Sequence, residues 1–276
     1  MKFAVSTYSF GEYASRGVPY MIDEAARLGF DGIEFCLDGG FTDGELSSFG
    51  RRARDAGLAA VCSAVGADFL RADPKEEIKR LAGEVRRASL LGVPLMRHDA
   101  SRGLPGKLSD GDFSDALPAL ADCCLEVSRF AAGLGVRTCV ENHGYFCQDA
   151  DRIVALVRAT DDGNFGALCD VGNFMCADEY PPDSAAKVAP YVFHVHAKDF
   201  YLKKGAPAEG GWFPTRGGDS LLGAAIGDGD AGAKKSLDAL RAAGYDGFVT
   251  VEYEGADDNL LGIARGLGFL KNHFAK

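Results

Sequence analysis

Four strand-like segments of this chain each end near a side chain that can bind a divalent cation. The four side chains are Glu141, Asp170, His196 and Glu252. Three carboxylates and one imidazole form a mixed oxygen and nitrogen ligand set, which suits Mn²⁺ best and also Mg²⁺, Co²⁺ or Zn²⁺. A single acidic residue at a strand end is equally well explained as a cap for the next helix. The prediction of one divalent-cation site therefore depends on all four residues occurring together.

Two of the predicted ligands are glutamates, and glutamates on either side of a metal ion can move protons. An ion that binds the carbonyl and hydroxyl oxygens of a ketose stabilises the enediolate formed when a proton leaves carbon. One glutamate would remove that proton and the other would return it. Glu141 and Glu252 are the predicted catalytic pair.

Other polar and aromatic residues lie near the ends of the predicted strands or in the loop after the seventh. The candidate substrate-binding residues are His98, His143, Asn173, His194, Lys198, Trp212 and Arg216. His194 is also explained as a hydrogen-bonded histidine inside the fold, and Trp212 as core packing. Lys198 either neutralises a phosphate or an enolate, or forms an ion pair with Asp199.

Strand-like and helix-like segments alternate along the whole chain. Amphipathic helical stretches lie between the strands, and most of them stop at a glycine, which is typical of a helix C-terminus. This alternation, without any change of composition, predicts a single (β/α)8 TIM barrel over residues 1–276. The eight predicted strands are Phe3–Ser6, Gly32–Phe35, Ala59–Val65, Pro94–His98, Thr138–Asn142, Gly166–Asp170, Val192–Lys198 and Phe248–Glu252.

An open, doubly wound sheet would show the same alternation, but it predicts a glycine-rich phosphate-binding motif after the first strand. Residues 7–12 read Thr-Tyr-Ser-Phe-Gly-Glu and contain no such motif. The candidate ligands instead end several different strands. That distribution favours a barrel, whose site draws on many loops at the carboxyl ends of its strands.

The longest irregular stretches predicted are Ser101–Gly111 and Phe200–Gly232. A loop as long as the second is usually functional or disordered. Because it directly follows the seventh strand, it should cover the mouth of the barrel. We interpret it as a substrate loop or lid.

Composition excludes several classes of protein. The chain has 276 residues and a net charge of −10, so nucleic acid is a disfavoured partner. No apolar run reaches the roughly 18 residues that a membrane span needs. The eight cysteines form no Cys-x-x-Cys pair and are interpreted as reduced thiols. The chain begins directly with a strand pattern, without signal-peptide character, which favours a cytoplasmic location.

The motifs resemble those of the sugar phosphate isomerase/epimerase superfamily, the xylose-isomerase-like TIM barrels. The resemblance covers essentially the whole chain and is strongest at residues 141–144, 170–173, 194–199 and 243–255. It implies metal ligation by Glu141, Asp170, His196 and Glu252, with proton transfer by the two glutamates. It also implies an isomerase or epimerase acting on a small sugar, sugar phosphate or related polyol. Members are often dimers or tetramers, so the resemblance implies a homo-oligomer as well.

The chain departs from the tagatose-type epimerases at two positions. Asn173 stands where they carry the histidine of an Asp-x-x-His motif, and Lys198 stands near the place of their arginine, with Arg216 only much later. Residues 217–230 also resemble members linked to C-glycoside deglycosylation. A metal-dependent lyase or dehydratase of the same superfamily, C-glycoside-cleaving or inosose dehydratase-like, therefore remains the first alternative.

Two further alternatives are less favoured. Apurinic endonucleases share the fold and bind three zinc ions, but this chain lacks the histidines of their Asp-x-x-His and Asp-x-His motifs. The corresponding positions hold Asn173 and Asp230. A non-catalytic sugar-binding subunit is disfavoured because Glu141 and Glu252 are both intact.

Overall fold

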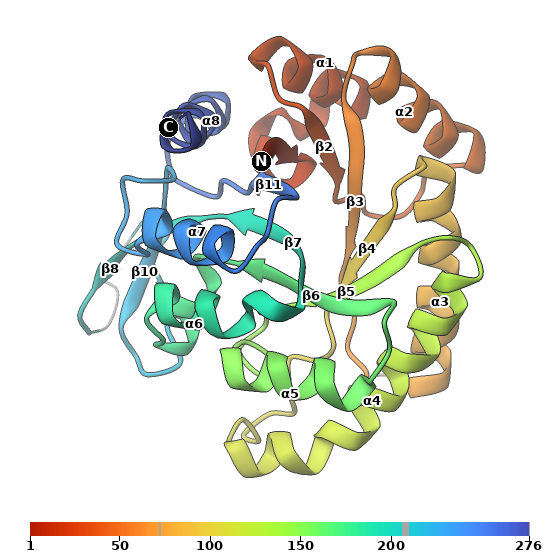
Figure 1. Ribbon diagram of the computed structural model, residues 1–276, viewed down its shortest axis with the longest axis vertical. Coiled ribbons are helices and arrows are strands. Elements are labelled where there is room, and N and C mark those ends of the chain that lie inside the picture. The colour runs from red at the N-terminus through yellow and green to blue at the C-terminus, as the bar shows by residue number, and fades with distance from the viewer. Residues whose placement is uncertain (72, 206–209, 276) are drawn as a thin grey trace.

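Eight parallel strands close into a barrel in the computed structural model, which describes residues 1–71, 73–205 and 210–275 (Figure 1). Each strand pairs with its two neighbours, in the order β1-β2-β3-β4-β5-β6-β7-β11 and back to β1. The predicted (β/α)8 barrel is therefore confirmed. The barrel strands are β1 (Lys2–Ser6), β2 (Gly32–Phe35), β3 (Ala59–Val65), β4 (Leu95–His98), β5 (Arg137–Glu141), β6 (Phe165–Asp170), β7 (Val192–Ala197) and β11 (Phe248–Val251).

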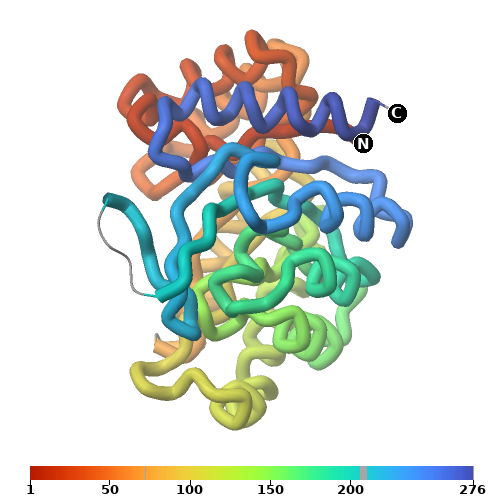
Figure 2. Tube along the Cα trace, turned by 90° about the vertical axis from the view of Figure 1, so that its left-hand side faces the viewer, coloured from red at the N-terminus to blue at the C-terminus, as the bar shows by residue number. Residues whose placement is uncertain are grey.

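Helices form a ring outside the barrel (Figures 1 and 2). Segments of 3-10 helix connect β1 to α1, β6 to α6, and α6 to β7. They are η1 (Thr7–Arg16), η2 (Asn173–Ala177) and η3 (Ala189–Tyr191). Among the helices in the described part of the chain, none is apolar over a length sufficient to cross a membrane. The α-helices are α1 (Val18–Leu28), α2 (Asp43–Asp55), α3 (Pro74–Leu91), α4 (Asp110–Ala132), α5 (Ala150–Thr160), α6 (Pro181–Val188), α7 (Ala233–Ala242) and α8 (Asn259–Phe274).

Local sequence signals account for the helix boundaries. Helix α2 begins with a capping box in which the Thr42 side chain and Glu45 satisfy each other's backbone amides. Helices α1 and α3 end at Gly29 and Gly92, whose φ angles are +84° and +76°. A residue with a Cβ atom is strained in this left-handed conformation, so glycine ends each helix and turns the chain toward the next strand.

Two apolar layers hold the barrel together. Inside the barrel, small and medium side chains such as Ala4, Cys62 and Leu168 fill the centre. Residues of opposite strand parity, such as Val195 on β7, pack outward against the helices. Because side chains alternate along a strand, this arrangement leaves His196 on β7 pointing into the barrel.

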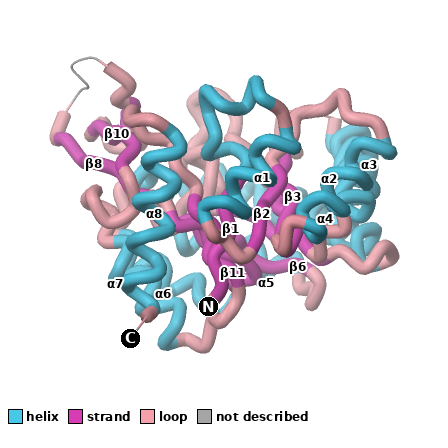
Figure 3. Tube along the Cα trace, turned by 90° about the horizontal axis from the view of Figure 1, so that it is seen from above, coloured by secondary structure: helices cyan, strands magenta, loops and turns pink. Residues whose placement is uncertain are grey.

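A second, three-stranded antiparallel sheet stands beyond the barrel after β7 (Figure 3). Its strands are β8 (Asp199–Lys203), β9 (Phe213–Pro214) and β10 (Ser220–Ala224), in the order β8-β10-β9. The prediction of irregular structure throughout Phe200–Gly232 is therefore wrong for these strands; residues 206–209 lie outside the described residues. Within the described ranges, these strands pair only with one another. The periodicity of each short segment does not reveal this pairing.

Asp199 anchors this extra sheet to the barrel. Its buried carboxylate accepts hydrogen bonds from four backbone amides. Oδ1 accepts from Phe200 and Ala231, both at 3.0 Å, and Oδ2 accepts from Gly227 at 2.9 Å and Gly229 at 3.2 Å. The carboxylate thus joins the start of β8 to the loop that leads into α7.

β10 also packs directly against the chain that follows β11. A Cβ atom at Gly223 would lie only 2.2 Å from the backbone oxygen of Glu254. Only glycine permits this close approach. The extra sheet is therefore positioned against the segment that carries Glu252 and Glu254.

We predict that Asp199→Asn lowers the free energy of unfolding by about 2 kcal/mol or more, because an amide cannot accept all four hydrogen bonds and leaves buried donors unpaired. Urea unfolding followed by circular dichroism measures the change. Asp228→Asn is the matched control in the same loop. Its exposed ion pair with Arg265 predicts a change within about 0.5 kcal/mol. Equal stability of the two variants would contradict the anchoring role.

Candidate metal centre

The carboxyl ends of four barrel strands bring the four predicted ligands together. Glu141 ends β5, Asp170 ends β6, His196 lies in β7, and Glu252 directly follows β11. One potential ligand atom from each lies within 4.8 Å of the other three. His196 Nδ1 is 3.7 Å from Glu141 Oε1, 3.8 Å from Asp170 Oδ2 and 3.5 Å from Glu252 Oε2. These atoms surround a common centre at the mouth of the barrel.

Glu34, the penultimate residue of β2, fixes the orientation of the His196 ring. His196 Nε2 lies 2.9 Å from Glu34 Oε2, and both side chains are buried. Nε2 donates its proton to the carboxylate, so Nδ1 is directed at the three other ligands. Such a hydrogen bond from the second ring nitrogen to a carboxylate is typical of metal-binding histidines. Burial opposes ionisation of Glu34, but the His196 imidazole holds its pKa below the usual range.

Two buried polar atoms facing this centre make no hydrogen bond among the described residues. They are His196 Nδ1 and Asp170 Oδ2, although the Lys198 ammonium lies 3.3 Å from the second of them. The other oxygen of Asp170 accepts from the backbone amides of Gly172 and Asn173, at 2.8 and 2.9 Å. Because buried polar atoms are normally satisfied, the unpaired His196 Nδ1, which faces three carboxylates, indicates a missing partner. The residues therefore fit a divalent cation.

The charge of the site favours the same type of ligand. Carboxylates outnumber permanent cations around the centre. Among the described residues, the carboxylates there form ion pairs with one lysine, Lys198, and one arginine, Arg97. A bound divalent cation would offset the excess negative charge. The buried or half-buried carboxylates are Glu34, Asp99, Glu141, Asp170, Glu252 and Glu254.

Glu141 is held as a carboxylate by its neighbours. Arg97 on β4 pairs with Glu141 Oε2, and Asn173 Nδ2 donates to Oε1 at 2.9 Å. Burial would raise the pKa of Glu141, but the charges of Arg97 and His196 outweigh it and hold the pKa below the ordinary value. Glu141 can therefore accept a proton at neutral pH.

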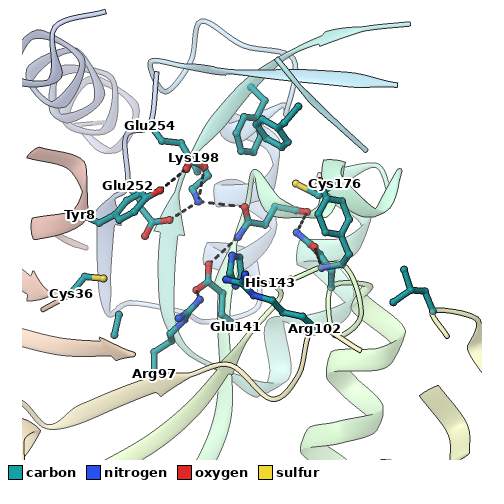
Figure 4. Close-up of a pocket in the computed structure, with 18 of the residues that line it drawn as sticks. Tyr8, Cys36, Arg97, Arg102, Glu141, His143, Cys176, Lys198, Glu252 and Glu254 are labelled. Carbon is teal, nitrogen blue, oxygen red and sulfur yellow. Dashed lines mark hydrogen bonds and ion pairs between the residues drawn. The ribbon is translucent and has the colours of Figure 1, made fainter. Parts of the chain in front are cut away.

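Glu252 is held as a carboxylate from the other side of the cavity (Figure 4). Lys198 Nζ lies 2.6 Å from Glu252 Oε2, 3.0 Å from Glu254 Oε1 and 3.3 Å from Asp170 Oδ2. Burial opposes ionisation, but Lys198 and then His196 hold the pKa of Glu252 well below its ordinary value. Lys198 thus pairs with these carboxylates, whereas Asp199 points to the extra sheet.

Asp170 and His196 carry protons that a cation would displace. Burial, reinforced by the charges of Glu141 and Glu252, raises the pKa of Asp170 to about 7 despite the nearby Lys198. Burial lowers the pKa of His196, but Glu34 and Glu252 raise it well above its ordinary value. In the absence of a metal ion, both groups are therefore more protonated than exposed counterparts would be.

A cavity of about 680 Å³ opens over this cluster. Three of the predicted substrate-binding residues, His143, Asn173 and Lys198, line it together with Glu141 and Glu252. Figure 4 shows Glu141 and Glu252 reaching the cavity from different elements, with His143 beside Glu141. The other four predicted substrate-binding residues lie elsewhere.

His98 points away from the cavity, and the preceding residue takes its place. The His98 ring packs against Phe69 and Phe165, with ring centroids 6.0 and 5.9 Å apart, and its Nδ1 contacts the Asp99 backbone oxygen. Since side chains alternate along β4, Arg97 faces the inside instead. A charged residue inside a short apolar strand was the signal in the sequence that could have identified Arg97.

His194 lies in the barrel interior, one layer deeper than the centre. Its Nε2 is 2.9 Å from Thr250 Oγ1 and 3.4 Å from Glu34 Oε2. Burial lowers the pKa of His194. Its position matches the alternative interpretation of a hydrogen-bonded histidine inside the fold.

Trp212 and Arg216 belong to the extra sheet and its turns, outside the cavity lining. Trp212 is half-buried, and the Lys203 ammonium lies 5.9 Å from its ring centroid. Arg216 pairs with Asp149 at 2.6 Å and donates to the backbone oxygen of Tyr145. Arg216 therefore ties the extra sheet to the loop after β5.

Four residues in or beside the cavity, Arg97, Asp99, Tyr8 and Glu254, were not among the predicted site residues. His143 Nδ1 lies 3.0 Å from Asp99 Oδ1, and Arg97 contacts the same oxygen at 2.9 Å. Tyr8 donates a hydrogen bond of 3.1 Å to Glu254 Oε2. The first contacts join the ends of β4 and β5, and the last joins η1 to the segment after β11. Such long-range pairs are not visible in local sequence patterns.

The sequence of this chain matches a known protein family. A family model described as the xylose isomerase-like TIM barrel matches residues 22–273. The protein YihM of Escherichia coli (strain K12) is 26% identical over 174 residues, which cover 63% of this chain and 48% of YihM. The matched region thus spans about half the length of this relative.

Solved structures share the fold over nearly the whole chain. The D-psicose 3-epimerase of Clostridium cellulolyticum H10, solved with D-tagatose, is similar with a TM-score of 0.74 and 18% identity, covering 99% of both chains. The probable 3-DHS dehydratase AsbF of Bacillus anthracis is similar with the same TM-score, identity and coverage. At this identity, the likeness concerns the fold alone.

We predict that the affinity for Mn²⁺ rises at least tenfold between pH 6 and pH 8. The pKa of Asp170 lies near 7 and that of His196 above its ordinary value, so protons compete with the cation in the acidic part of this range. Isothermal titration calorimetry in two buffers of different ionisation enthalpy measures both the affinity and the protons released.

Asp170→Asn should weaken Mn²⁺ binding by about 100-fold or more, because it removes one ligand and its charge. Asp115→Asn, an exposed change on α4, is the control and should leave the affinity unchanged. An affinity for Mn²⁺ that is independent of pH, or equal in both variants, would argue against the centre.

Proposed function

Because this chain belongs to the family of xylose isomerase-like TIM barrels, we propose that it is a divalent-metal-dependent isomerase or epimerase. Its substrate would be a small sugar, sugar phosphate or related polyol. The reaction would be proton transfer beside a carbonyl group, with Glu141 and Glu252 as the proton-transferring residues. The cation would be held by Glu141, Asp170, His196 and Glu252, and Mn²⁺ is the first candidate.

One observation carries this proposal. Two carboxylates that are held ionised, Glu141 by Arg97 and Glu252 by Lys198, face one cavity and share a cluster with Asp170 and His196, whose Nδ1 makes no hydrogen bond to the described residues. A cation-binding cluster without available bases would suggest a structural metal site. Bases without the cluster would lack a means of stabilising a carbanion.

The bound cation would supply Lewis-acid stabilisation of the negative charge that develops on the substrate oxygens. One glutamate accepts the proton from the carbon beside the carbonyl and becomes a neutral carboxylic acid. The other glutamate, on the opposite side, must first take up a proton from water. Delivery of that proton yields an epimer if it reaches the same carbon and an isomer if it reaches the neighbouring one. Transfer by positioned groups of this kind typically contributes about 10²- to 10⁴-fold to the rate.

The neighbours of the two glutamates have distinct positioning roles. Asn173 donates to Glu141 Oε1 and is itself 3.4 Å from Lys198 Nζ, so one chain of polar contacts links the two carboxylates. Lys198 holds Glu252 and also Asp170. These contacts restrict both carboxylates to rotamers that face the cavity, which favours proton transfer over short distances.

A lyase or dehydratase is the second candidate, and one contact favours it. His143 lines the cavity and is paired with Asp99, which raises its pKa against the opposing effect of burial. An imidazolium in this position could protonate a departing oxygen after Glu141 or Glu252 removes a proton from carbon. The solved structures that resemble this chain include both an epimerase and a probable dehydratase, and they do not favour one over the other.

We predict that Glu141→Gln and Glu252→Gln each slow solvent hydrogen exchange into substrate by about 100-fold or more, because a glutamine cannot accept the proton. Candidate ketoses, sugar acids and inososes are incubated with the Mn²⁺-loaded protein in heavy water and followed by NMR and mass spectrometry. Exchange with retained mass indicates isomerisation or epimerisation, and loss of water or of an aglycone indicates a lyase.

Glu126→Gln, an exposed change on α4, serves as the matched control and should exchange substrate at the parent rate. Mn²⁺ affinity is measured for every variant, so that a loss of the cation is separated from a loss of the base. If either glutamine variant retained the full exchange rate while binding Mn²⁺, the assignment of that residue would be wrong.

A further inference from the structure

The cavity has two chemically different halves. Near the barrel centre it is lined by charged and amide side chains, among them Glu141, Lys198 and Glu252. The mouth is built by the loop after β4, the loop after β5 and the extra sheet. These parts contribute mainly apolar and aromatic groups, namely Leu104, Pro105, Leu108, Tyr145 and Phe213, with the fully buried Phe200 packed behind Phe213.

Two polar side chains on the mouth side, Tyr145 and Gln148, already have partners within the protein, and the guanidinium of Arg102 also lines this half. The Tyr145 hydroxyl donates to the Pro214 backbone oxygen at 2.5 Å. Gln148 accepts from the Tyr145 backbone amide at 2.5 Å and donates to the Asn173 backbone oxygen at 2.8 Å. The surface that Tyr145 and Gln148 offer to a ligand therefore consists of ring faces and aliphatic carbon.

This wall is poorly suited to a second set of sugar hydroxyls. Each hydroxyl that left water and found no partner there would cost about tenfold or more in affinity. A free hexose needs partners around its whole circumference, whereas this cavity supplies them mainly at the metal-centre end.

The same wall is well suited to an aromatic ring. Phe213 and Phe200 already pack edge to face, with centroids 5.4 Å apart and an interplanar angle of 79°, a geometry that a third ring can extend. Leu104 and Leu108 are each 37% exposed on the opposite loop, where a ligand would cover them. Arg102 lines the cavity beside Gly144, and a guanidinium can stack on a ring.

We propose that the natural substrate is an aryl-substituted sugar or polyol rather than a free small sugar. Its hydroxyl and carbonyl groups would lie on the metal centre, and its aromatic ring would lie between Leu104 and Leu108 on one side and Tyr145 and Phe213 on the other. The position of the polar head rests on the proposed function. The position of the ring rests on the mouth residues alone.

The test compares phenyl β-D-glucoside with methyl β-D-glucoside, which differ only in the apolar group. Isothermal titration calorimetry of the full chain, with Mn²⁺ and again with EDTA, gives the ratio of the two affinities. We expect the phenyl glucoside to bind at least tenfold more tightly in both conditions. Mn²⁺ should strengthen the binding of both glucosides.

Leu104→Ser should reduce the phenyl-to-methyl ratio at least threefold, because it makes the mouth polar at an exposed position that the fold tolerates. Phe213→Ala should reduce it further. Leu134→Ser is the matched control, because Leu134 is 42% exposed and lies outside the cavity lining. Its ratio should equal that of the parent protein.

The outcomes separate this inference from the proposed function. A phenyl-to-methyl ratio near one, or a ratio that Leu104→Ser leaves unchanged, overturns the aryl-binding mouth. A second copy of the chain covering the loop after β4, detected by sedimentation, would likewise overturn the aryl-binding mouth. If the phenyl-to-methyl ratio is high but Mn²⁺ strengthens the binding of neither glucoside, the result supports the aryl-binding mouth. The same result counts against a polar head bound at the metal centre.

Discussion

Mutual repulsion among buried carboxylates is the constraint around which the barrel mouth is organised. Glu141, Asp170 and Glu252 come from the ends of three strands and meet at one point because parallel strands of a closed barrel all end on the same side. Glu34 lies at the other ring nitrogen of His196. Burying these charges in water-poor surroundings is tolerable only with partners of opposite charge. Arg97, Lys198 and the His196 imidazole supply part of that charge. His196 Nδ1, which makes no hydrogen bond to the described residues, indicates where the remainder belongs.

These cations also divide the carboxylates into two groups with different chemistry. Glu141 and Glu252 lie directly beside Arg97 and Lys198, and their pKa values are lowered. Asp170 has one oxygen occupied by backbone amides and the other near the two glutamates, so burial and repulsion dominate and its pKa is raised. Neighbouring carboxylates thus acquire different proton affinities from their surroundings, which is the usual basis for separate roles in one site.

The extra sheet adds a second layer of control over the same centre. Asp199 joins the start of β8 to the loop before α7 through four backbone amides, and Gly223 lets β10 approach the backbone of Glu254. Arg216 joins the sheet to the loop after β5. As a result, Phe213, which packs on the buried Phe200, is held at a defined place above the ligands rather than on a free loop.

Local sequence patterns were sufficient to identify the alternating elements and most of their boundaries. Glycines such as Gly29 end helices for a local steric reason, and strand ends such as Asp170 are recognisable because an apolar run stops there. Both features lie within a few residues of chain, so they can be read without knowing the fold. The four residues at the centre were identified for the same reason.

Tertiary structure alone decided which side chains face the cavity and what surrounds them. His98 and Arg97 are adjacent in β4, and only the register of the closed barrel determines that Arg97 points inward. Glu34 reaches His196 across 162 residues of sequence, and β8, β9 and β10 form a sheet only by pairing with one another. Such contacts depend on how the barrel closes and on which strands meet, and no short stretch of sequence contains that information.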